Sequence, residues 1–338
     1  MKKTTIGVAG TAKNTGKTTT IVALLKKLKE ENTRPIGLTG IGYDGESFDN
    51  VTGLPKPRID VFEGMIVAVA ERCLKFGRAK IETLLQTGIQ TPLGRIVIGR
   101  VKEAGKLVLA GPVKGSDLRN TLDCMAGCGA DLIFVDGAFG RMAPFSKTDG
   151  LILATGASRN SDIAELAIES GHMANLLNRP VLPMNGKTAR FGSVLSEESL
   201  QAFFSTFAPA DTMLVEGLLS GRFLRAIAKN KELSGKRLLF DSPLKLLLAG
   251  EINQTYEALG EMEQGLNMEI GVQKAVKVIS ITVNPYYPKY RYATRDYEAA
   301  FVDKSALIDA IKSSMDLPCF NVVVDGANGL LREIYKLS

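Results

Sequence analysis

Tryptophan is absent from this 338-residue chain and histidine occurs only once, which argues against two kinds of site. Surfaces that bind nucleic-acid bases depend on aromatic side chains, and many catalytic zinc sites depend on several histidines. Cysteine is also scarce. Cys124 and Cys128 lie four residues apart, and no second pair completes a zinc or iron–sulfur set. We therefore expect all four cysteines to be reduced, partly buried thiols.

The sequence also lacks a long hydrophobic run and a concentration of charge of one sign. No stretch approaches the ~20 apolar residues that a membrane helix requires, and the apolar segment 6–9 is too short for a signal peptide. The 42 basic and 36 acidic side chains give a net charge of +6, without a basic run that would form a nucleic-acid-binding tail. These features predict a cytoplasmic protein that binds neither membranes nor nucleic acids.

Short apolar runs alternate with helical patterns along the chain. This alternation is typical of an α/β protein whose parallel sheet is covered on both sides by helices. We expect strands at 4–9, 35–39, 131–135, 150–154 and 180–183, and helices at 18–30, 62–76 and 161–177. The helix after the first strand is the clearest, because Ile21, Leu24, Leu25 and Leu28 recur at helical spacing.

The pattern restarts near residue 193. Further strands are expected at 212–215, 237–240, 276–283 and 321–324, with helices at 243–259 and 304–315. Because a chain of this length exceeds what one hydrophobic core usually supports, we predict two domains. The first covers residues 1–192, and a second, smaller α/β domain covers residues 193–338.

The loop after the first strand carries the strongest functional signal, Gly10-Thr-Ala-Lys-Asn-Thr-Gly-Lys-Thr-Thr19. Gly10 and Gly16 let the backbone approach a polyphosphate, and the loop N–H groups and the next helix N-terminus offer partial positive charge. Lys17 supplies a full charge to the phosphates, and the Thr18 hydroxyl is a ligand for Mg²⁺. The pattern predicts a P-loop with nucleotide contacts at Gly10, Thr11, Lys13, Asn14, Thr15, Gly16, Lys17, Thr18 and Thr19.

The loop and its strand resemble those of dethiobiotin synthetase and its relatives among P-loop proteins. Thr11 stands where the usual pattern has its first glycine, and Ala12 stands where many related ATPases carry a second lysine. The segment 13–19 is also similar to small proteins that assist molybdopterin dinucleotide synthesis. The resemblance implies a parallel, doubly wound P-loop NTPase domain that binds ATP and Mg²⁺. ATP is expected rather than GTP because no Asn-Lys-x-Asp follows a strand.

Polar residues at strand ends are candidates for the rest of the site. Asp136 follows the apolar strand 131–135, where the metal needs a hard oxygen ligand, so we predict Asp136 and Lys17 as catalytic residues. The resemblance implies a further metal ligand at Asp44, or less strongly Glu46, and a base contact at Asn185. Ordinary loop and Asn-Gly turn positions are the alternatives for these three.

A tyrosine-rich segment, Asn284-Pro-Tyr-Tyr-Pro-Lys-Tyr-Arg-Tyr292, is the most unusual part of the expected second domain. Tyrosine and arginine favour interfaces, so Tyr287, Tyr290 and Arg291 are candidate anchors for a partner. A rigid loop that packs on its own domain, fixed by its prolines, is an equal alternative.

Three functions follow from these features. The N-terminal loop, the mid-chain Val-Asp-Gly-Ala-Phe-Gly-Arg141 and the extra α/β half are similar to an accessory protein of adenosylcobalamin-dependent lysine 5,6-aminomutase. That resemblance implies an ATPase that reactivates a partner enzyme. The alternatives are an ATP-dependent ligase or kinase that activates a small carboxylate, as in dethiobiotin synthetase, and a nucleotide-binding regulator. A homodimer stays open.

Overall fold

The computed structural model of the chain describes residues 3–31, 34–42, 59–141 and 143–337. The chain divides into two compact units. The first unit comprises Met1–Ala167 and Lys277–Ser338, and the second unit comprises Ile168–Val276. The chain therefore leaves the first unit once and later returns to it.

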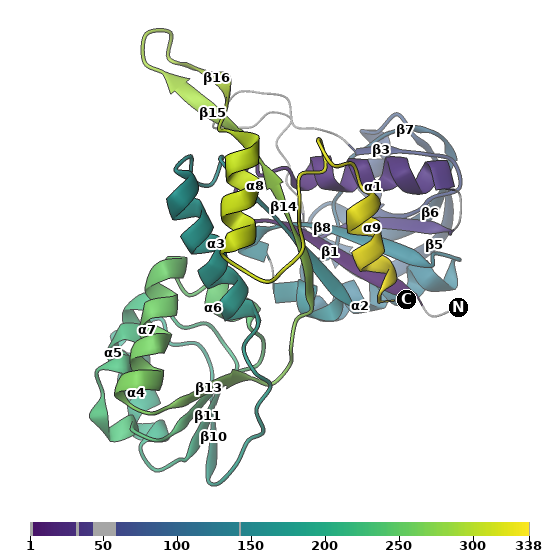
Figure 1. Ribbon diagram of the computed structural model, residues 1–338. Coiled ribbons are helices and arrows are strands. Elements are labelled where there is room, and N and C mark those ends of the chain that lie inside the picture. The colour runs from purple at the N-terminus through teal and green to yellow at the C-terminus, as the bar shows by residue number, and fades with distance from the viewer. Residues whose placement is uncertain (1–2, 32–33, 43–58, 142, 338) are drawn as a thin grey trace. The chain divides into compact units, whose positions relative to one another are not determined.

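Nine strands of the first unit form one sheet in the order β17-β14-β9-β1-β8-β2-β4-β6-β5 (Figure 1). Their bounds are β1 (Thr4–Gly10), β2 (Ile36–Gly40), β4 (Ile66–Ala70), β5 (Lys80–Thr91), β6 (Gly94–Glu103), β8 (Leu132–Ala138), β9 (Gly150–Gly156), β14 (Val278–Asn284) and β17 (Cys319–Phe320). Neighbours from β17 to β4 are parallel, whereas β6 is antiparallel to β4 and β5. The expected α/β class with a mostly parallel sheet is confirmed.

The central strands are buried throughout, which explains their continuous apolar runs. Every residue of β1, β4 and β9 is buried, as expected for parallel strands covered on both faces. Phe145 fills the space next to two glycines of adjacent strands, since a Cβ on Gly7 or Gly137 would lie only 2.3 or 2.6 Å from its ring. These contacts fix β1 and β8 side by side around one large side chain.

Helices α1 (Lys17–Glu31), α2 (Gly115–Gly127), α8 (Lys304–Ser313) and α9 (Asn328–Tyr335) pack on this sheet. The predicted apolar stripe of α1 is confirmed, because Ile21, Leu24, Leu25 and Leu28 are all buried. Helix α1 contacts β1, β8, β9 and also α9, so α1 and α9 share one face of the sheet. Two short strands, β3 (Ile59–Val61) and β7 (Gly105–Leu107), form a separate antiparallel pair.

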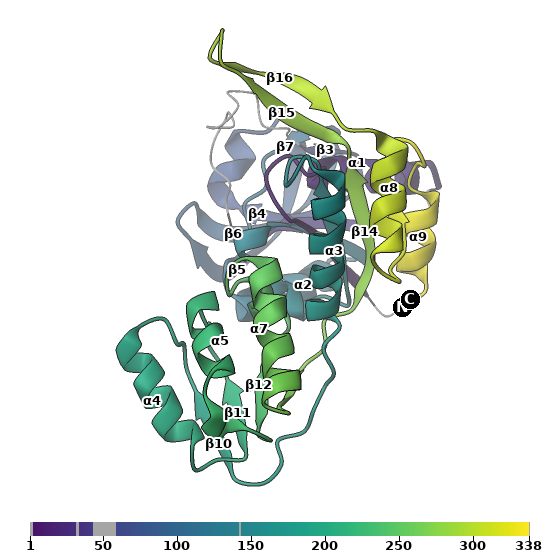
Figure 2. The ribbon, with the colours of Figure 1, turned by 60° about the vertical axis from the view of Figure 1, so that its left-hand side comes forward.

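A hairpin leaves the carboxyl end of β14. Its strands are β15 (Tyr286–Arg291) and β16 (Asp296–Phe301), which pair only with each other among the described strands. In both ribbon views the hairpin projects away from the sheet of the first unit (Figures 1 and 2). The tyrosine-rich segment is therefore an extended arm rather than an irregular loop.

The second unit is a smaller α/β fold with a four-stranded parallel sheet. Its strands are β10 (Thr188–Phe191), β11 (Thr212–Val215), β12 (Arg237–Phe240) and β13 (Glu269–Val272), and its helices are α4 (Glu197–Phe207), α5 (Gly221–Ala228), α6 (Leu244–Leu247) and α7 (Ile252–Gly265). Helix α3 (Ile163–Leu177) contains the point of division between the units. Ser196 caps α4 by accepting a hydrogen bond from Ser199 N.

The predicted division into residues 1–192 and 193–338 differs from the observed one at both ends of the second unit. The second unit begins earlier, at Ile168, and residues 277–338 belong to the first unit. The reason is the pairing of β14 with β9, which places the last part of the chain in the large sheet. The tyrosine-rich arm, predicted in the second domain, is accordingly part of the first unit.

Four predicted elements also differ. The helix expected at 243–259 is divided into α6 and α7, and α7 continues to Gly265. The helix expected at 62–76 is strand β4 followed by a short 3-10 helix, Glu71–Lys75. The strand expected at 180–183 is reduced to one bridge between Val181 and Val272. The strand expected at 321–324 is a turn after β17. In each case the apolar pattern of the segment is compatible with more than one kind of secondary structure. Packing against the rest of the protein determines whether a helix, a strand or a turn forms.

Candidate functional site

The segment between β1 and α1 contains two residues with left-handed backbone. Strand β1 ends at Gly10 and α1 begins at Lys17; between them Asn14 has φ 61° and Gly16 has φ 90°. A backbone that changes hand in this way turns successive N–H groups into a concave nest for an anion. The first N–H groups of α1 lack intrahelical acceptors and add partial positive charge. The loop therefore presents the main-chain donors that a phosphate requires.

Two buried threonines hold this loop in shape. Thr11 N donates to Ala154 O at 2.9 Å, and Thr11 Oγ1 donates to Thr155 Oγ1 of β9 at 3.0 Å. Thr15 Oγ1 donates to Ala12 O at 3.0 Å, which closes the loop on itself. Both threonine side chains are thus committed to the protein, and the predicted contacts at these positions fall to main-chain groups. Thr11 stands where the usual pattern has glycine. Its hydrogen bonds to β9 give this threonine a structural role.

Lys17 and Asp136 meet at the carboxyl ends of the neighbouring strands β1 and β8. Lys17 Nζ lies 2.8 Å from Asp136 Oδ1, and the two side chains are only 22% and 17% exposed. Oδ1 is buried, and the Lys17 ammonium is its counter-charge. The structure thus brings together the two residues predicted as catalytic.

Asn284 contacts the same loop and was not among the predicted site residues. It is the last residue of β14, and its Nδ2 donates to Asn14 O at 3.0 Å. A Cβ on Gly16 would lie 3.1 Å from the Asn284 Cβ, and a Cβ on Gly156 would lie 2.1 Å from Asn284 O. Only glycine at position 156 permits this approach. The signal in the sequence was an asparagine directly after a strong apolar strand.

Arg159 adds a second cation beside the loop and was also not predicted. It lies in the turn after β9, where its Nη1 donates to Thr11 O at 2.6 Å. Its guanidinium stands 5.3 Å from the centre of the Phe139 ring, in the segment that follows β8. Arg159 therefore bridges the residues after β8 and β9 at the carboxyl edge of the sheet, on either side of β1.

Three predicted polar residues remain to be considered: Asp44, Glu46 and Asn185. Asp44 and Glu46 lie outside the described residues, so a further metal ligand there stays a prediction. Asn185 belongs to the second unit, where it precedes β10 and its main-chain oxygen accepts a hydrogen bond from Thr212 Oγ1 at 2.7 Å. It follows no strand of the large sheet, which removes the basis on which a contact with the nucleotide base was expected.

The donor set fits a magnesium ion that arrives with a nucleotide better than a resident metal. Within the described ranges, no group of three His, Cys, Asp or Glu side chains is arranged to hold a metal ion. A Mg²⁺ bound with a nucleotide takes most of its ligands from phosphate and water and needs one or two from the protein. The Asp136 carboxylate, which faces Lys17, and the hydroxyl of Thr18 at the start of α1 suit that requirement.

All four cysteines lie in the first unit, where their surroundings disfavour cysteine chemistry. All four cysteines are free thiols, as predicted. Burial raises the pKa of Cys319 to about 12 and raises the pKa of Cys73 as well. The pKa of Cys128 is raised by burial and then by its neighbour Cys124. Because the thiolate is the reactive form, these three thiols stay protonated at neutral pH.

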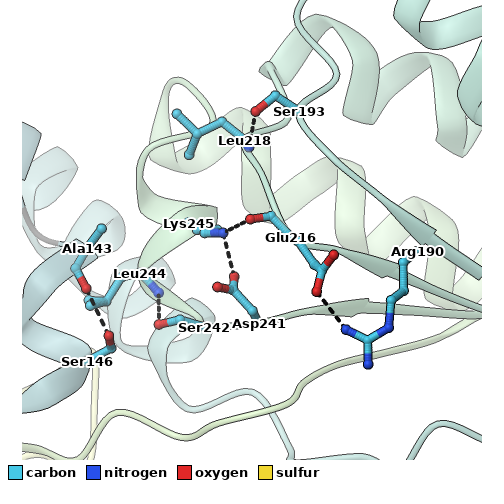
Figure 3. A network of polar contacts seen from close by, with 10 residues as sticks. All are labelled: Ala143, Ser146, Arg190, Ser193, Glu216, Leu218, Asp241, Ser242, Leu244 and Lys245. Carbon is cyan, nitrogen blue, oxygen red and sulfur yellow. Dashed lines mark hydrogen bonds and ion pairs between the residues drawn. The ribbon is translucent and has the colours of Figure 1, made fainter. Parts of the chain in front are cut away.

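A second group of charged side chains lies at the carboxyl edge of the sheet in the second unit (Figure 3). Glu216 follows β11, and Asp241 follows β12. Lys245 of α6 donates to Glu216 O and lies 2.7 Å from Asp241 Oδ1, and its side chain is only 14% exposed. Arg190 Nη1 lies 2.6 Å from Glu216 Oε1. Each charge has an opposite partner, so this group ties α6 to the strand ends.

Lys245→Ala is expected to lower the stability of the second unit by about 1–2 kcal/mol, because the buried Asp241 Oδ1 would lose its counter-charge and Glu216 O would lose a hydrogen bond. Urea unfolding of the full chain, followed by circular dichroism, measures the loss. Lys274→Ala removes an exposed lysine beyond β13 of the same sheet and should stay within about 0.5 kcal/mol of the unmodified chain. Equal midpoints for the two variants would show that the Lys245 pair contributes nothing.

Comparison with known proteins assigns no family to the chain. No family model matches it, and no curated protein matches its sequence. In the part of the chain that the structure describes, no helix is both long and apolar enough to cross a membrane. The interpretation of the site therefore depends on its own geometry and chemistry.

Proposed function

We propose that the chain is a Mg-ATP-dependent P-loop ATPase that acts as an accessory, reactivating protein for a partner enzyme. The observation that carries the nucleotide site is the Lys17–Asp136 pair beside a loop with left-handed Asn14 and Gly16. In open parallel sheets, ligands bind at the carboxyl ends of strands where the strand order reverses. Strand β1 occupies such a place, because β8 and β2 lie on one side of it and β9 and β14 on the other.

The residues at this edge have different roles in phosphoryl transfer. The loop N–H groups bind the phosphates, and Lys17 exchanges Asp136 for the oxygens of the terminal phosphates. That exchange leaves the Asp136 carboxylate, together with the Thr18 hydroxyl, to hold Mg²⁺, which neutralises phosphate charge when it is bound. Asn284 and Arg159 keep the loop in position through their contacts with Asn14 O and Thr11 O.

A ligase or kinase for a small carboxylate is the second candidate, and one observation favours it. Arg141 follows β8 and lies against Gly42, where a Cβ would be 2.9 Å from the Arg141 Nη1. A guanidinium at this edge of the sheet is the group that would hold the carboxylate of a substrate. An accessory ATPase does not require such a contact.

ATP turnover of the purified chain separates the two candidates. We expect slow hydrolysis that EDTA abolishes and that no small carboxylic acid stimulates, because an accessory protein completes its productive geometry only with its partner. The measurement is ADP release from the full chain alone and with a panel of mono- and dicarboxylic acids. Strong stimulation by one acid would establish the ligase instead. Absence of both ATP binding and hydrolysis would contradict the proposal as a whole.

A further inference from the structure

The β15–β16 hairpin has two chemically different faces. Successive strand residues point to opposite faces, and directly opposed residues of an antiparallel pair share a face. The cross-strand pairs Tyr286–Phe301, Pro288–Ala299 and Tyr290–Tyr297 therefore form one side, the aromatic face. The pairs Tyr287–Ala300, Lys289–Glu298 and Arg291–Asp296 form the other, the charged face. All the hairpin's paired acidic and basic residues lie on the charged face.

The aromatic face is ordered by its own rings and exposed to solvent. Tyr286 packs edge-on against Phe301 at 5.7 Å between ring centres, and Tyr290 contacts Tyr297 at 5.1 Å and Tyr292 at 5.0 Å. Yet Phe301 is 66% exposed and Tyr292 is 87% exposed. A two-stranded hairpin has no second layer of its own to cover such a face. An exposed aromatic cluster of this kind is typical of a protein interface.

The charged face carries two basic and two acidic side chains, Lys289, Arg291, Asp296 and Glu298, and this balance argues against an anionic partner. Arg291 Nε donates to Asp296 Oδ1 at 2.8 Å, and a second Arg291 nitrogen lies 3.8 Å from Glu298. The hydrogen bond from Arg291 lowers the pKa of Asp296 to about 2, so the pair stays ionised at neutral pH. Arg291 is therefore engaged within the hairpin and does not suit the predicted role of anchor. A nucleic acid or an anionic membrane would need free cations, and the aromatic face carries none.

The size of the aromatic face indicates a transient contact. Two strands of six residues form a face of roughly 20 by 10 Å. Because the side chains make this face uneven, about 200–400 Å² of surface is available for contact. Stable interfaces bury about 800 Å² on each partner, so the face alone is too small to hold a permanent dimer of this chain. It suits a partner that is bound and released.

The base of the hairpin is joined to the phosphate loop. Asn284 Nδ2 donates to Asn14 O of the loop, and Asn284 Oδ1 accepts a hydrogen bond from Tyr286 N at 3.2 Å. Ser158, after β9, donates to Tyr286 O at 3.0 Å. One asparagine side chain thus links the loop to the first residue of the aromatic face. A displacement of Asn14 in the loop would therefore act on the start of β15 through this side chain.

We propose that the aromatic face docks transiently into an uncharged, apolar groove of a partner protein, and that the nucleotide at the loop controls this contact through Asn284. The nucleotide control rests on the proposed function, whereas the docking face stands on the hairpin alone. Tyr290, Tyr292 and Phe301, which are exposed at that face, supply the contact. Tyr287 and Arg291, predicted earlier as anchors, lie on the charged face.

Site-specific photo-crosslinking of the full chain in an extract of its own cells tests the docking face. A benzophenone amino acid at position 292 should join one distinct protein, and the same group at position 289 on the charged face should not. With that protein purified, Tyr290→Ser/Phe301→Ser should weaken binding by at least about 10-fold. The matched charged-face variant Lys289→Ala/Glu298→Ala should change it by less than about 2-fold. Both variants should keep normal ATP affinity.

Several outcomes would overturn the docking proposal. These are crosslinking from both positions alike, crosslinking only to a second copy of the chain or to nucleic acid, no crosslinked product, and equal loss of binding in the two double variants. Equal partner affinity in Mg-ATP and Mg-ADP would refute the nucleotide control. Failure of the unmodified chain to bind ATP would refute the proposed function, while the face-specific loss of binding would still be measurable.

Discussion

Replacement of Lys17 by alanine is expected to remove most of the stability that Mg-ATP gives to the native chain. At 100 times its Kd the nucleotide adds about 2.7 kcal/mol to the free energy of unfolding by mass action. Loss of a charge-assisted contact with phosphate weakens binding by about 10²-fold, so the same concentration would then add only about 0.4 kcal/mol. Thermal unfolding of the variant, with and without Mg-ATP, measures the difference.

The nucleotide-free variant is also expected to lose stability, because Asp136 Oδ1 would remain buried without its counter-charge. The quantity to compare is therefore the ATP-dependent shift rather than the melting temperature itself. Lys26→Ala is the matched control, since Lys26 is an exposed lysine on the same helix; it should keep the full shift. A full shift in Lys17→Ala would remove Lys17 from the phosphate site.

The elements around the loop between β1 and α1 could be predicted because their signals are local. A short apolar run, a glycine-containing loop and the stripe of Ile21, Leu24 and Leu25 follow one another within thirty residues, and each restricts the next. Strands β8 and β9 were found in the same way, as continuous apolar runs that need cover on both faces. The position of Asp136 beside the loop followed from placing two carboxyl strand ends at one edge, whereas its ion pair with Lys17 was not predicted.

The partners of distant strands could not be predicted, because hydrophobic periodicity does not say which strand lies beside which. The run 278–284 is as apolar as β8, and nothing in it indicates that it pairs with β9 across an inserted second unit. The role of Asn284 depends on that pairing. Asn185, chosen instead, also follows an apolar run, but that run forms only one bridge, with Val272 of the second unit.

For the tyrosine-rich segment, the sequence likewise does not show which side chains share a face. Its composition indicates an interface, but the choice of anchors requires the cross-strand register of β15 and β16. Only that register separates Tyr290 from Tyr287 and assigns Arg291 to Asp296 within the hairpin.

Asp136→Asn is expected to slow ATP hydrolysis by about 10²-fold or more while changing ATP affinity much less. Asparagine keeps the size of the side chain and removes the charge that the metal and the developing charge on the phosphates require. Binding is spared for a structural reason. Asp136 lies 2.8 Å from Lys17, so the variant releases Lys17 for the phosphates and offsets part of the lost metal contact.

Single-turnover hydrolysis and equilibrium ATP binding, measured on the same preparation, give the two numbers separately. Asp131→Asn is the matched control, because Asp131 immediately precedes β8 and stands at the opposite end of that strand. It should leave both quantities within about 2-fold of the unmodified chain, as a change away from a site usually does. If Asp136→Asn lowers affinity and turnover equally, Asp136 acts in binding alone. If turnover is unchanged, the carboxylate serves only to position Lys17.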